Sequence, residues 1–333
     1  MKRINNGIVF SNDIYRILSG KNALDYNYQE RGMIIPSKDE INFLRENFKK
    51  DVNRIFEGQV EIIEEEDMEG YMYEVLKSSE NLPIVSLDRV YLYDKNKIKQ
   101  DVYFIDCTRI DNSKELIPRK ENNAISVSKQ IEIISQKLKE TEQTNILLFD
   151  DVVFSGNVLK NIINQFNRNN ISVQGIRACI STEEAYKYFN KNMDKGLKCG
   201  CLLGTNVIDQ VCERDFYFGI AQSGITAIDK KGIIRKTPYF KPYGNPVERA
   251  SIPEEYEDFF SNGCLLRSLY LWKKIEDNTG RRIYVRDLPE KIINTNEKER
   301  ILDVLRKGLI YDEKESDEKN SNRDNGFSRW FKL

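Results

Sequence analysis

The densest group of residues that could do chemistry lies at 146–159, with the sequence Ile-Leu-Leu-Phe-Asp-Asp-Val-Val-Phe-Ser-Gly-Asn-Val-Leu. Two adjacent carboxylates, Asp150 and Asp151, follow four apolar residues, and Ser155 and Gly156 come shortly after them. Carboxylates accept hydrogen bonds from sugar hydroxyls, or hold a magnesium ion already bound to those hydroxyls. A glycine lets the backbone approach an anion closely, and a serine adds a hydroxyl donor. The segment therefore combines groups that suit a sugar with groups that suit a phosphate.

The elements around these residues would bring them to one point. Residues 146–149 form an apolar run that predicts a buried strand, and the apolar residues after Gly156 recur with helical spacing. A parallel strand that leads into a helix presents free backbone N–H groups, and the helix dipole adds partial positive charge there. We therefore expect residues 146–159 to form a strand–loop–helix phosphate cradle that binds a ribose-5-phosphate group. The alternative is a buried strand, an acidic turn and a helix without a ligand.

Two better-known phosphate-binding motifs do not fit this segment. A Walker motif would need a Gly-Lys-Ser/Thr sequence, and a dinucleotide-binding fingerprint would need three spaced glycines. Neither occurs at 146–159.

The surrounding chain alternates between predicted strands and helices. Helices are expected at 127–138, 158–166 and 182–190, and strands at 102–106, 145–149, 173–180, 197–203 and 216–220. Strands that alternate with helices of this length indicate a mostly parallel sheet flanked by helices, in an α/β fold.

Helical regions are expected on both sides of this domain. A helix over 38–57 with Ser37 as its N-cap precedes two short strands at 82–87 and 89–93. A long apolar stripe over 259–275, ended by Gly280, and a second helix at 296–308 follow the sheet. The sequence thus predicts an N-terminal helical or mixed region at 1–100, an α/β domain at 101–245, a C-terminal helical region at 246–311 and a charged, flexible tail at 312–333.

The composition limits the chemistry and the location. The chain has no histidine, which excludes Ser–His–Asp and Cys–His catalysis and leaves acid–base work to carboxylates, Lys, Tyr, Cys or substrate phosphates. The net charge of −1 argues against a globally basic nucleic-acid binder. The six cysteines are expected to be reduced and mostly buried. We expect a cytoplasmic protein, because no apolar run is long enough to span a bilayer and the N-terminus lacks the apolar core of a signal peptide.

The cradle resembles the phosphoribosyl pyrophosphate (PRPP) motif of type I phosphoribosyltransferases. That motif has four hydrophobic residues, two acids, a few mostly apolar residues and then Ser/Thr-Gly-x-Ser/Thr. Asp150, Asp151, Ser155 and Gly156 match it in type and spacing, whereas Val158 replaces the second hydroxyl residue. Asn157 could supply the missing contact. The resemblance covers about 100–225 and is specific only at this motif.

The resemblance implies roles for residues on either side of the motif. An earlier strand would lead into a pyrophosphate loop, where Arg109 could grip the pyrophosphate, although it could equally be a surface arginine. The segment 114–123, with Arg119 and Lys120, stands where a covering loop is expected. Phe216 and Tyr217 match the residues that stack on and read the base, although they could simply be core aromatics. Ser223 stands where an acid is expected, so the base cannot be inferred.

The implied activity is transfer of ribose 5-phosphate from PRPP, with Mg²⁺ bound mainly through PRPP, to a nucleobase, nucleotide or other acceptor. Asp150, Asp151 and Arg109 would be the catalytic residues, and Phe216 and Tyr217 the base-binding ones. The residues expected to contact PRPP are Asp150, Asp151, Val152, Phe154, Ser155, Gly156, Asn157, Val158 and Leu159.

The added terminal regions resemble the larger phosphoribosyltransferase-like proteins of bacterial conflict and anti-phage systems, including some retron cassettes. That resemblance implies a defence effector that acts with a partner protein or nucleic acid. We also expect the chain to form an oligomer. One alternative is a sensor or regulatory protein that binds ribose phosphates without catalysis. A third possibility is an interaction protein whose locally basic C-terminal segment docks a partner or nucleic acid, although a solvated helix face explains that segment as well. Its basic residues are Arg267, Lys273, Lys274, Arg281, Arg282 and Arg286.

Overall fold

The computed structural model describes residues 1–77, 81–93, 98–110, 116–118, 125–229 and 232–316. The chain divides into two compact units, each built from several segments. The first unit comprises Met1–Asp25, Gln59–Gln210 and Thr226–Ile234, and the second comprises Tyr26–Gly58, Val211–Ile225 and Arg235–Leu333. These boundaries do not coincide with the predicted ones at 100, 245 and 311, since the first hundred residues contribute to both units.

A seven-stranded sheet forms the centre of the first unit, in the order β2-β1-β9-β8-β7-β3-β4. The pairs β1–β2, β3–β4, β3–β7, β7–β8 and β8–β9 all run parallel. The expected α/β fold with a mostly parallel sheet flanked by helices is therefore confirmed. The strands are β1 (Lys2–Ser11), β2 (Val60–Ile63), β3 (Ile84–Ser86), β4 (Val102–Phe104), β7 (Asn145–Val153), β8 (Ser172–Thr182) and β9 (Leu197–Cys212).

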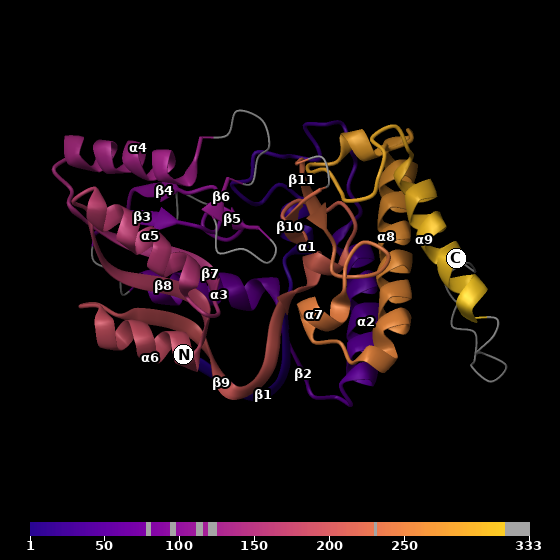
Figure 1. The fold of residues 1–333 in the computed structure, drawn as a ribbon, viewed down its shortest axis with the longest axis horizontal. Coiled ribbons are helices and arrows are strands. Elements are labelled where there is room, and N and C mark those ends of the chain that lie inside the picture. The colour runs from indigo at the N-terminus through magenta and orange to yellow at the C-terminus, as the bar shows by residue number, and fades with distance from the viewer. Residues whose placement is uncertain (78–80, 94–97, 111–115, 119–124, 230–231, 317–333) are drawn as a thin grey trace. The chain divides into compact units, whose positions relative to one another are not determined.

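Helices cover both faces of this sheet. Figure 1 shows α4, α5 and α6 on the near face and α3 behind the sheet. Tyr71 of α3 lies against Gly200 of β9 so closely that a β-carbon at 200 would be 2.2 Å from the β-carbon of Tyr71. The helices of this unit are α1 (Ile14–Leu18), α3 (Glu65–Lys77), α4 (Val127–Glu140), α5 (Asn157–Arg168) and α6 (Glu183–Asn192).

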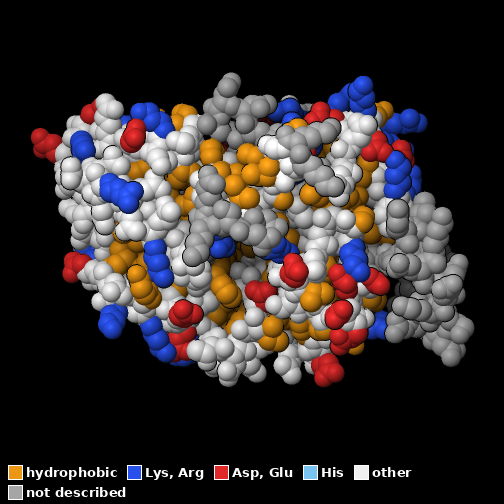
Figure 2. Space-filling model, viewed as in Figure 1, with side chains coloured by type: hydrophobic (Ala, Val, Ile, Leu, Met, Phe, Trp, Pro, Cys, Tyr) orange, Lys and Arg blue, Asp and Glu red, His pale blue; other side chains and the backbone are white. Residues whose placement is uncertain are grey.

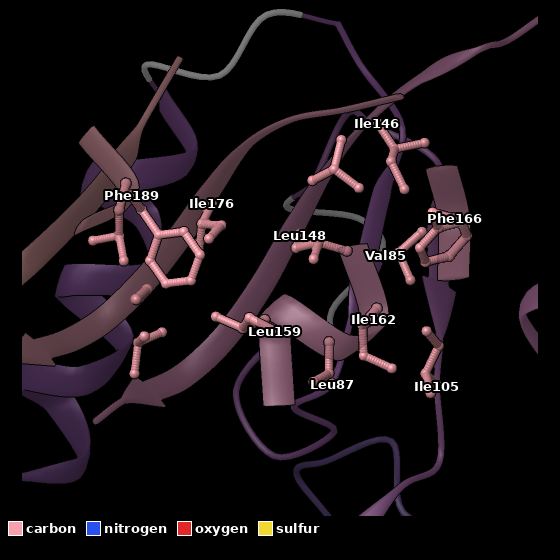
Figure 3. Packing of buried hydrophobic residues seen from close by; sticks show 14 of the residues in the cluster. Val85, Leu87, Ile105, Ile146, Leu148, Leu159, Ile162, Phe166, Ile176 and Phe189 are labelled. Atoms are coloured by element: carbon pink, nitrogen blue, oxygen red, sulfur yellow. The ribbon is translucent and has the colours of Figure 1, made fainter. Parts of the chain in front are cut away.

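The core beneath α4, α5 and α6 follows from the alternation of side chains along the central strand. Ile146 and Leu148 point toward these helices, where they meet Leu159, Ile162 and Phe166 of α5 (Figure 3). Leu147 and Phe149 point to the opposite face and are also fully buried. A strand that is buried on both faces reads as a continuous apolar run, which explains why β7 was predictable.

The second unit is mainly helical, with α8 at its centre. Helices α2 and α9 both pack against α8. Phe48 of α2 stacks on Phe216, and both rings meet Phe260 of α8. The helical elements are α2 (Lys38–Ile55), the 3-10 helix η1 (Glu213–Phe216), α7 (Pro246–Ala250), η2 (Glu254–Tyr256), α8 (Glu257–Thr279), η3 (Val285–Asp287) and α9 (Ile301–Ser316).

Two small hairpin sheets complete the described structure. Thr108–Arg109 (β5) pairs with Leu116–Ile117 (β6) in antiparallel register. Ile225–Ile228 (β10) pairs with Ile234–Thr237 (β11).

Several predicted helix ends are confirmed. The Ser37 hydroxyl accepts a hydrogen bond from the N–H of Glu40, and the Glu40 carboxylate accepts one from the N–H of Ser37, so a capping box begins α2. Gly280 adopts a left-handed conformation (φ = 72°) and ends α8.

Other predicted elements are wrong. The expected strand at 89–93 is a turn, because the Asp88 carboxylate draws the following N–H groups toward itself. The expected strand at 216–220 is replaced by η1 and a turn inside the second unit. The first strand, β1, was not predicted. Residues 312–316 of the expected tail belong to α9, and the rest of the tail lies outside the described residues.

Two predictions about composition can be compared with the structure. Five of the six cysteines are buried, as expected, and all six are free thiols. Among the described residues, no helix is both long enough and apolar enough to cross a membrane.

Candidate phosphate-binding site

The strand–loop–helix arrangement at 146–159 is present in the first unit. Strand β7 continues through both aspartates to Val153, and α5 begins at Asn157. Gly156 is the N-cap of α5 in a left-handed conformation (φ = 67°), and its carbonyl accepts the helix hydrogen bond from the N–H of Lys160 (3.0 Å). The loop thus turns directly into the helix, so the N–H groups of the first helical turn point toward it.

The loop is held in place by the junction between β8 and α6. The Thr182 hydroxyl donates a hydrogen bond to the carbonyl of Phe154 (2.7 Å) and accepts one from the N–H of Ala185 (3.2 Å), so it caps α6 as well. A β-carbon at Gly156 would lie 2.5 Å from the Phe189 ring of α6. Glycine is therefore required at 156 by backbone conformation and by space.

The two aspartates lie half-buried at the carboxyl end of β7. One Asp150 carboxylate oxygen accepts a hydrogen bond from the N–H of Asp151 (3.2 Å), and one Asp151 oxygen accepts a hydrogen bond from the N–H of Val152 (2.8 Å). An ionised carboxylate has about four lone-pair sites, so each aspartate can accept more than one hydrogen bond.

The topology of the sheet places this site at a switch point. From β3 the chain moves outward to β4, then returns to β7 on the other side of β3 and continues outward to β8. In open α/β sheets, ligands bind outside the carboxyl ends of the strands where the order reverses in this way. The loop after β7 and the loop after β3 therefore border the same position.

Asp88, in the loop after β3, is a site residue that sequence reasoning missed. Its carboxylate is 4% exposed and accepts hydrogen bonds from the N–H groups of Val90 (2.9 Å), Tyr91 (2.8 Å) and Leu92 (3.1 Å). Burial, followed by the nearby charge of Asp151, raises the pKa of Asp88 to about 6. A signal was present in the sequence, because Asp88 follows its buried strand as Asp150 follows 146–149.

The other residues of the motif divide into exposed and buried side chains. Phe154, Ser155 and Asn157 are exposed, and the Ser155 hydroxyl lies 3.5 Å from the N–H of Asn157. Val158 packs against the core cluster and Leu159 belongs to it, so these two residues can offer the loop only their backbone groups. Val152 is half-buried in the strand.

Arg109 lies farther from the cradle in the topology than expected. It is an exposed residue of β5, which follows the edge strand β4, and β3 separates β4 from β7. The neighbouring Thr108 hydroxyl is 3.3 Å from that of Thr226. Arg119 and Lys120 lie outside the described residues.

Phe216 and Tyr217 are fully buried in the second unit. Phe216 stacks on Phe48 with ring centroids 5.6 Å apart, and the Tyr217 hydroxyl donates a hydrogen bond to Glu213 (3.3 Å). Neither ring has an exposed face on which a base could stack, and Ser223 is also buried. The structure therefore places these residues in a core, which was the alternative explanation of their aromatic character.

The basic residues of the C-terminal segment are largely paired in the second unit. Arg267 is fully buried and forms an ion pair with Asp51. Lys273 pairs with Asp277 (2.6 Å), Lys274 with Glu40 (3.1 Å) and Arg281 with Asp287 (3.6 Å). These contacts fit the interpretation of the segment as an ordinary helix face rather than a free basic surface.

Comparison with known proteins identifies no relative: no protein-family model, curated protein or solved structure matches the chain.

Proposed function

We propose that the first unit binds the ribose-5-phosphate group of PRPP and transfers it to an acceptor, as the resemblance of 146–159 to the phosphoribosyltransferase motif implies. The observation that carries the proposal is the cradle itself, in which two adjacent aspartates end a central strand immediately before a glycine-capped helix. Its position at the switch point of the sheet supports a ligand there.

In this proposal each part of the cradle has a separate task. The N–H groups at the start of α5 and the Ser155 hydroxyl hold the 5-phosphate, because the helix terminus offers donors and partial positive charge. Asp150 and Asp151 accept hydrogen bonds from the ribose hydroxyls. The loop after β3, shaped by Asp88, borders the part of the ligand that extends across the switch point.

The donor set at the site also suits magnesium. Asp150 and Asp151 present carboxylate oxygens, which Mg²⁺ prefers. Negative charge is concentrated here, since the charge of Asp151 raises the pKa of the nearby Asp88. These two aspartates would hold the hydroxyl-bound ion in place. When bound, the ion supplies positive charge that offsets the charge of the diphosphate.

The reaction would break the bond between ribose C1 and the pyrophosphate oxygen and form a bond from C1 to a nucleophilic atom of the acceptor. Pyrophosphate leaves with the bonding electron pair, and positive charge develops on the ribose. Such a reaction depends on positioning and charge stabilisation, so it needs no histidine, and the chain has none.

Titration calorimetry with PRPP and Mg²⁺ tests the binding step. Asp151→Asn and Asp150→Asn should each weaken binding at least about tenfold, because a hydrogen bond to a charged group contributes about 1.5–3 kcal/mol. Asp194→Asn, at an exposed position of the same unit, is the matched control and should bind like the wild type. Unchanged affinity in both site variants would exclude this assignment of the site.

A second candidate function, ribose-phosphate sensing without catalysis, is favoured by one observation. Val158 packs against the core where the family motif has a hydroxyl residue, so the loop lacks one side-chain donor for the phosphate. Incubation with PRPP, Mg²⁺ and a panel of bases, nucleotides and oligonucleotides separates the two functions. Release of pyrophosphate would support the transferase, and binding without release would support the sensor.

A further inference from the structure

The segment that begins in the cradle is free of carboxylates. No Asp or Glu occurs from Val152 to Thr182, although 53 of the 333 residues of the chain are acidic. Helix α5 lies wholly inside this segment, and its only charged residues are Lys160 and Arg168. Its remaining polar residues are amides. An exposed helix of this composition does not repel a polyanion, and its amides can donate and accept hydrogen bonds.

These polar residues form one stripe along the helix. Asn157, Asn161, Asn164 and Arg168 are exposed and recur at spacings of three or four, and the half-buried Lys160 lies beside them. The stripe begins at the first residue after Gly156 and runs the length of the 12-residue helix, which is about 18 Å. It therefore continues the phosphate cradle along the surface.

Two exposed aromatic side chains border the stripe. Phe154, in the cradle loop, is 48% exposed, and Tyr188, on α6, is 43% exposed. The Lys160 ammonium lies 3.8 Å from the centre of the Tyr188 ring, so the two side chains form a cation–π contact. Figure 2 shows hydrophobic side chains at the surface between α5 and α6, with Lys or Arg side chains near them.

The contacts of the loop and of α6 keep this surface organised. The Thr182 hydroxyl joins the Phe154 carbonyl to the start of α6. Glu183, the first acidic residue after the carboxylate-free segment, is paired with Arg3 (2.9 Å) and Lys187 (3.1 Å). Glu183 is thus neutralised by two cations, whereas the exposed Glu184 lies one helical turn before Tyr188 on α6.

We propose that this α5 surface, made up of Phe154, Asn157, Lys160, Asn164, Arg168 and Tyr188, binds single-stranded nucleic acid. Exposed aromatic rings can stack on bases only where the bases are unstacked, which favours a single strand over a duplex. Amides and two cations without carboxylates suit a phosphate backbone better than the surface of a second copy of this chain, whose net charge is close to zero. The inference rests on the proposed function only in naming an oligonucleotide as the acceptor presented to the cradle.

Fluorescence anisotropy with a labelled 5′-phosphorylated 12-mer tests the proposal on the full chain, using DNA and RNA strands in separate titrations. Binding should weaken as salt rises, and a duplex of the same sequence should bind at least about tenfold more weakly. Asn164→Glu should weaken single-strand binding about tenfold, because it puts a carboxylate in the middle of the stripe. Tyr188→Ala should have a similar effect through lost stacking.

The same change at another exposed helical amide, Asn53→Glu on α2, is the matched control and should leave affinity unchanged. Circular dichroism and the affinity for PRPP should be unchanged in Asn164→Glu, which separates this surface from the proposed function. If the wild-type protein binds PRPP but not the single strand, only the further inference is overturned. Absence of binding, equal binding by Asn164→Glu, or equal binding of the duplex would each overturn it.

Discussion

A β-carbon at position 156 would lie 2.5 Å from Cε2 of Phe189, so the cradle loop and α6 fit together only because Gly156 has no side chain. The relationship joins two residues that are 33 positions apart in the chain and restricts which residue the loop can carry at 156. It also means that the phosphate site depends on the packing of α6 and not on the loop sequence alone.

Gly156→Ala should destabilise the first unit by about 2–4 kcal/mol, because it adds left-handed backbone strain to an overpacked contact. Hydrogen exchange of the β7 and β8 amides measures the change, and PRPP binding should weaken with it. Gly232→Ala is the control within the same unit, since Gly232 is also left-handed (φ = 77°) but has open space around it. If the two variants lose equal stability, the contact with Phe189 is not what requires the glycine.

Asp151→Asn should stabilise the first unit at pH 7 while it weakens ligand binding. The folded-state pKa of Asp88 is raised from 3.8 to about 6, so the folded protein binds this proton more tightly than the unfolded chain does. The contribution of Asp88 to the free energy of unfolding is therefore largest below pH 3.8 and is lost as the pH rises through about 6. Removing the charge of Asp151 relieves part of that loss.

The expected gain is about 1 kcal/mol at pH 7 and close to zero at pH 4, since burial is the larger cause of the shift and remains. Hydrogen exchange at the two pH values measures it. An equal gain at both would show that Asp151 and Asp88 do not interact through charge.

The sequence predicted the sheet and cradle because their patterns are local. Residues 146–149 are buried on both faces and the motif is contiguous, so neither depends on distant partners. Asp88 and β1 were missed for the opposite reason. The role of Asp88 depends on β3 lying beside β7, and β1 joins the sheet next to β9, which is almost 200 residues away in the chain.

The aromatic pair Phe216–Tyr217 shows a different limit. Its apolar character fits a strand, a base-binding segment or a hydrophobic core. Only the packing of Phe216 on Phe48 and Phe260 distinguishes these three possibilities. Composition reveals that such residues are buried but not what buries them.

Glu213→Gln should remove a pH dependence from the stability of the second unit. Burial raises the pKa of Glu213 from 4.5 to about 7, and Arg45 and Arg267 only partly oppose this. The folded state holds the proton more tightly, so unfolding free energy declines from pH 4.5 to 7 by up to about 3 kcal/mol. Fluorescence of the buried Trp272 during denaturation reports on this unit. An unaltered pH profile in the variant would contradict the assignment.

Asp51→Asn should destabilise the same unit by about 3 kcal/mol, because it leaves the fully buried Arg267 guanidinium without its charged partner. Asp39→Asn, at an exposed position of the same helix, is the control and should cost less than about 1 kcal/mol. Denaturation followed by Trp272 fluorescence compares the two. Equal effects would mean that Asp51 acts as an ordinary surface charge.

Ser155→Ala should weaken PRPP binding about tenfold without changing stability. The Ser155 side chain is exposed and its hydroxyl lies 3.5 Å from the N–H of Asn157, which is too long for a strong local bond, so the folded protein loses little when it is removed. A hydrogen bond to a phosphate oxygen contributes about 1.5–3 kcal/mol, and its loss appears only when ligand is bound. Calorimetry with PRPP and thermal denaturation without it separate the two effects. Lower stability with unchanged affinity would show that Ser155 shapes the loop and does not contact the phosphate.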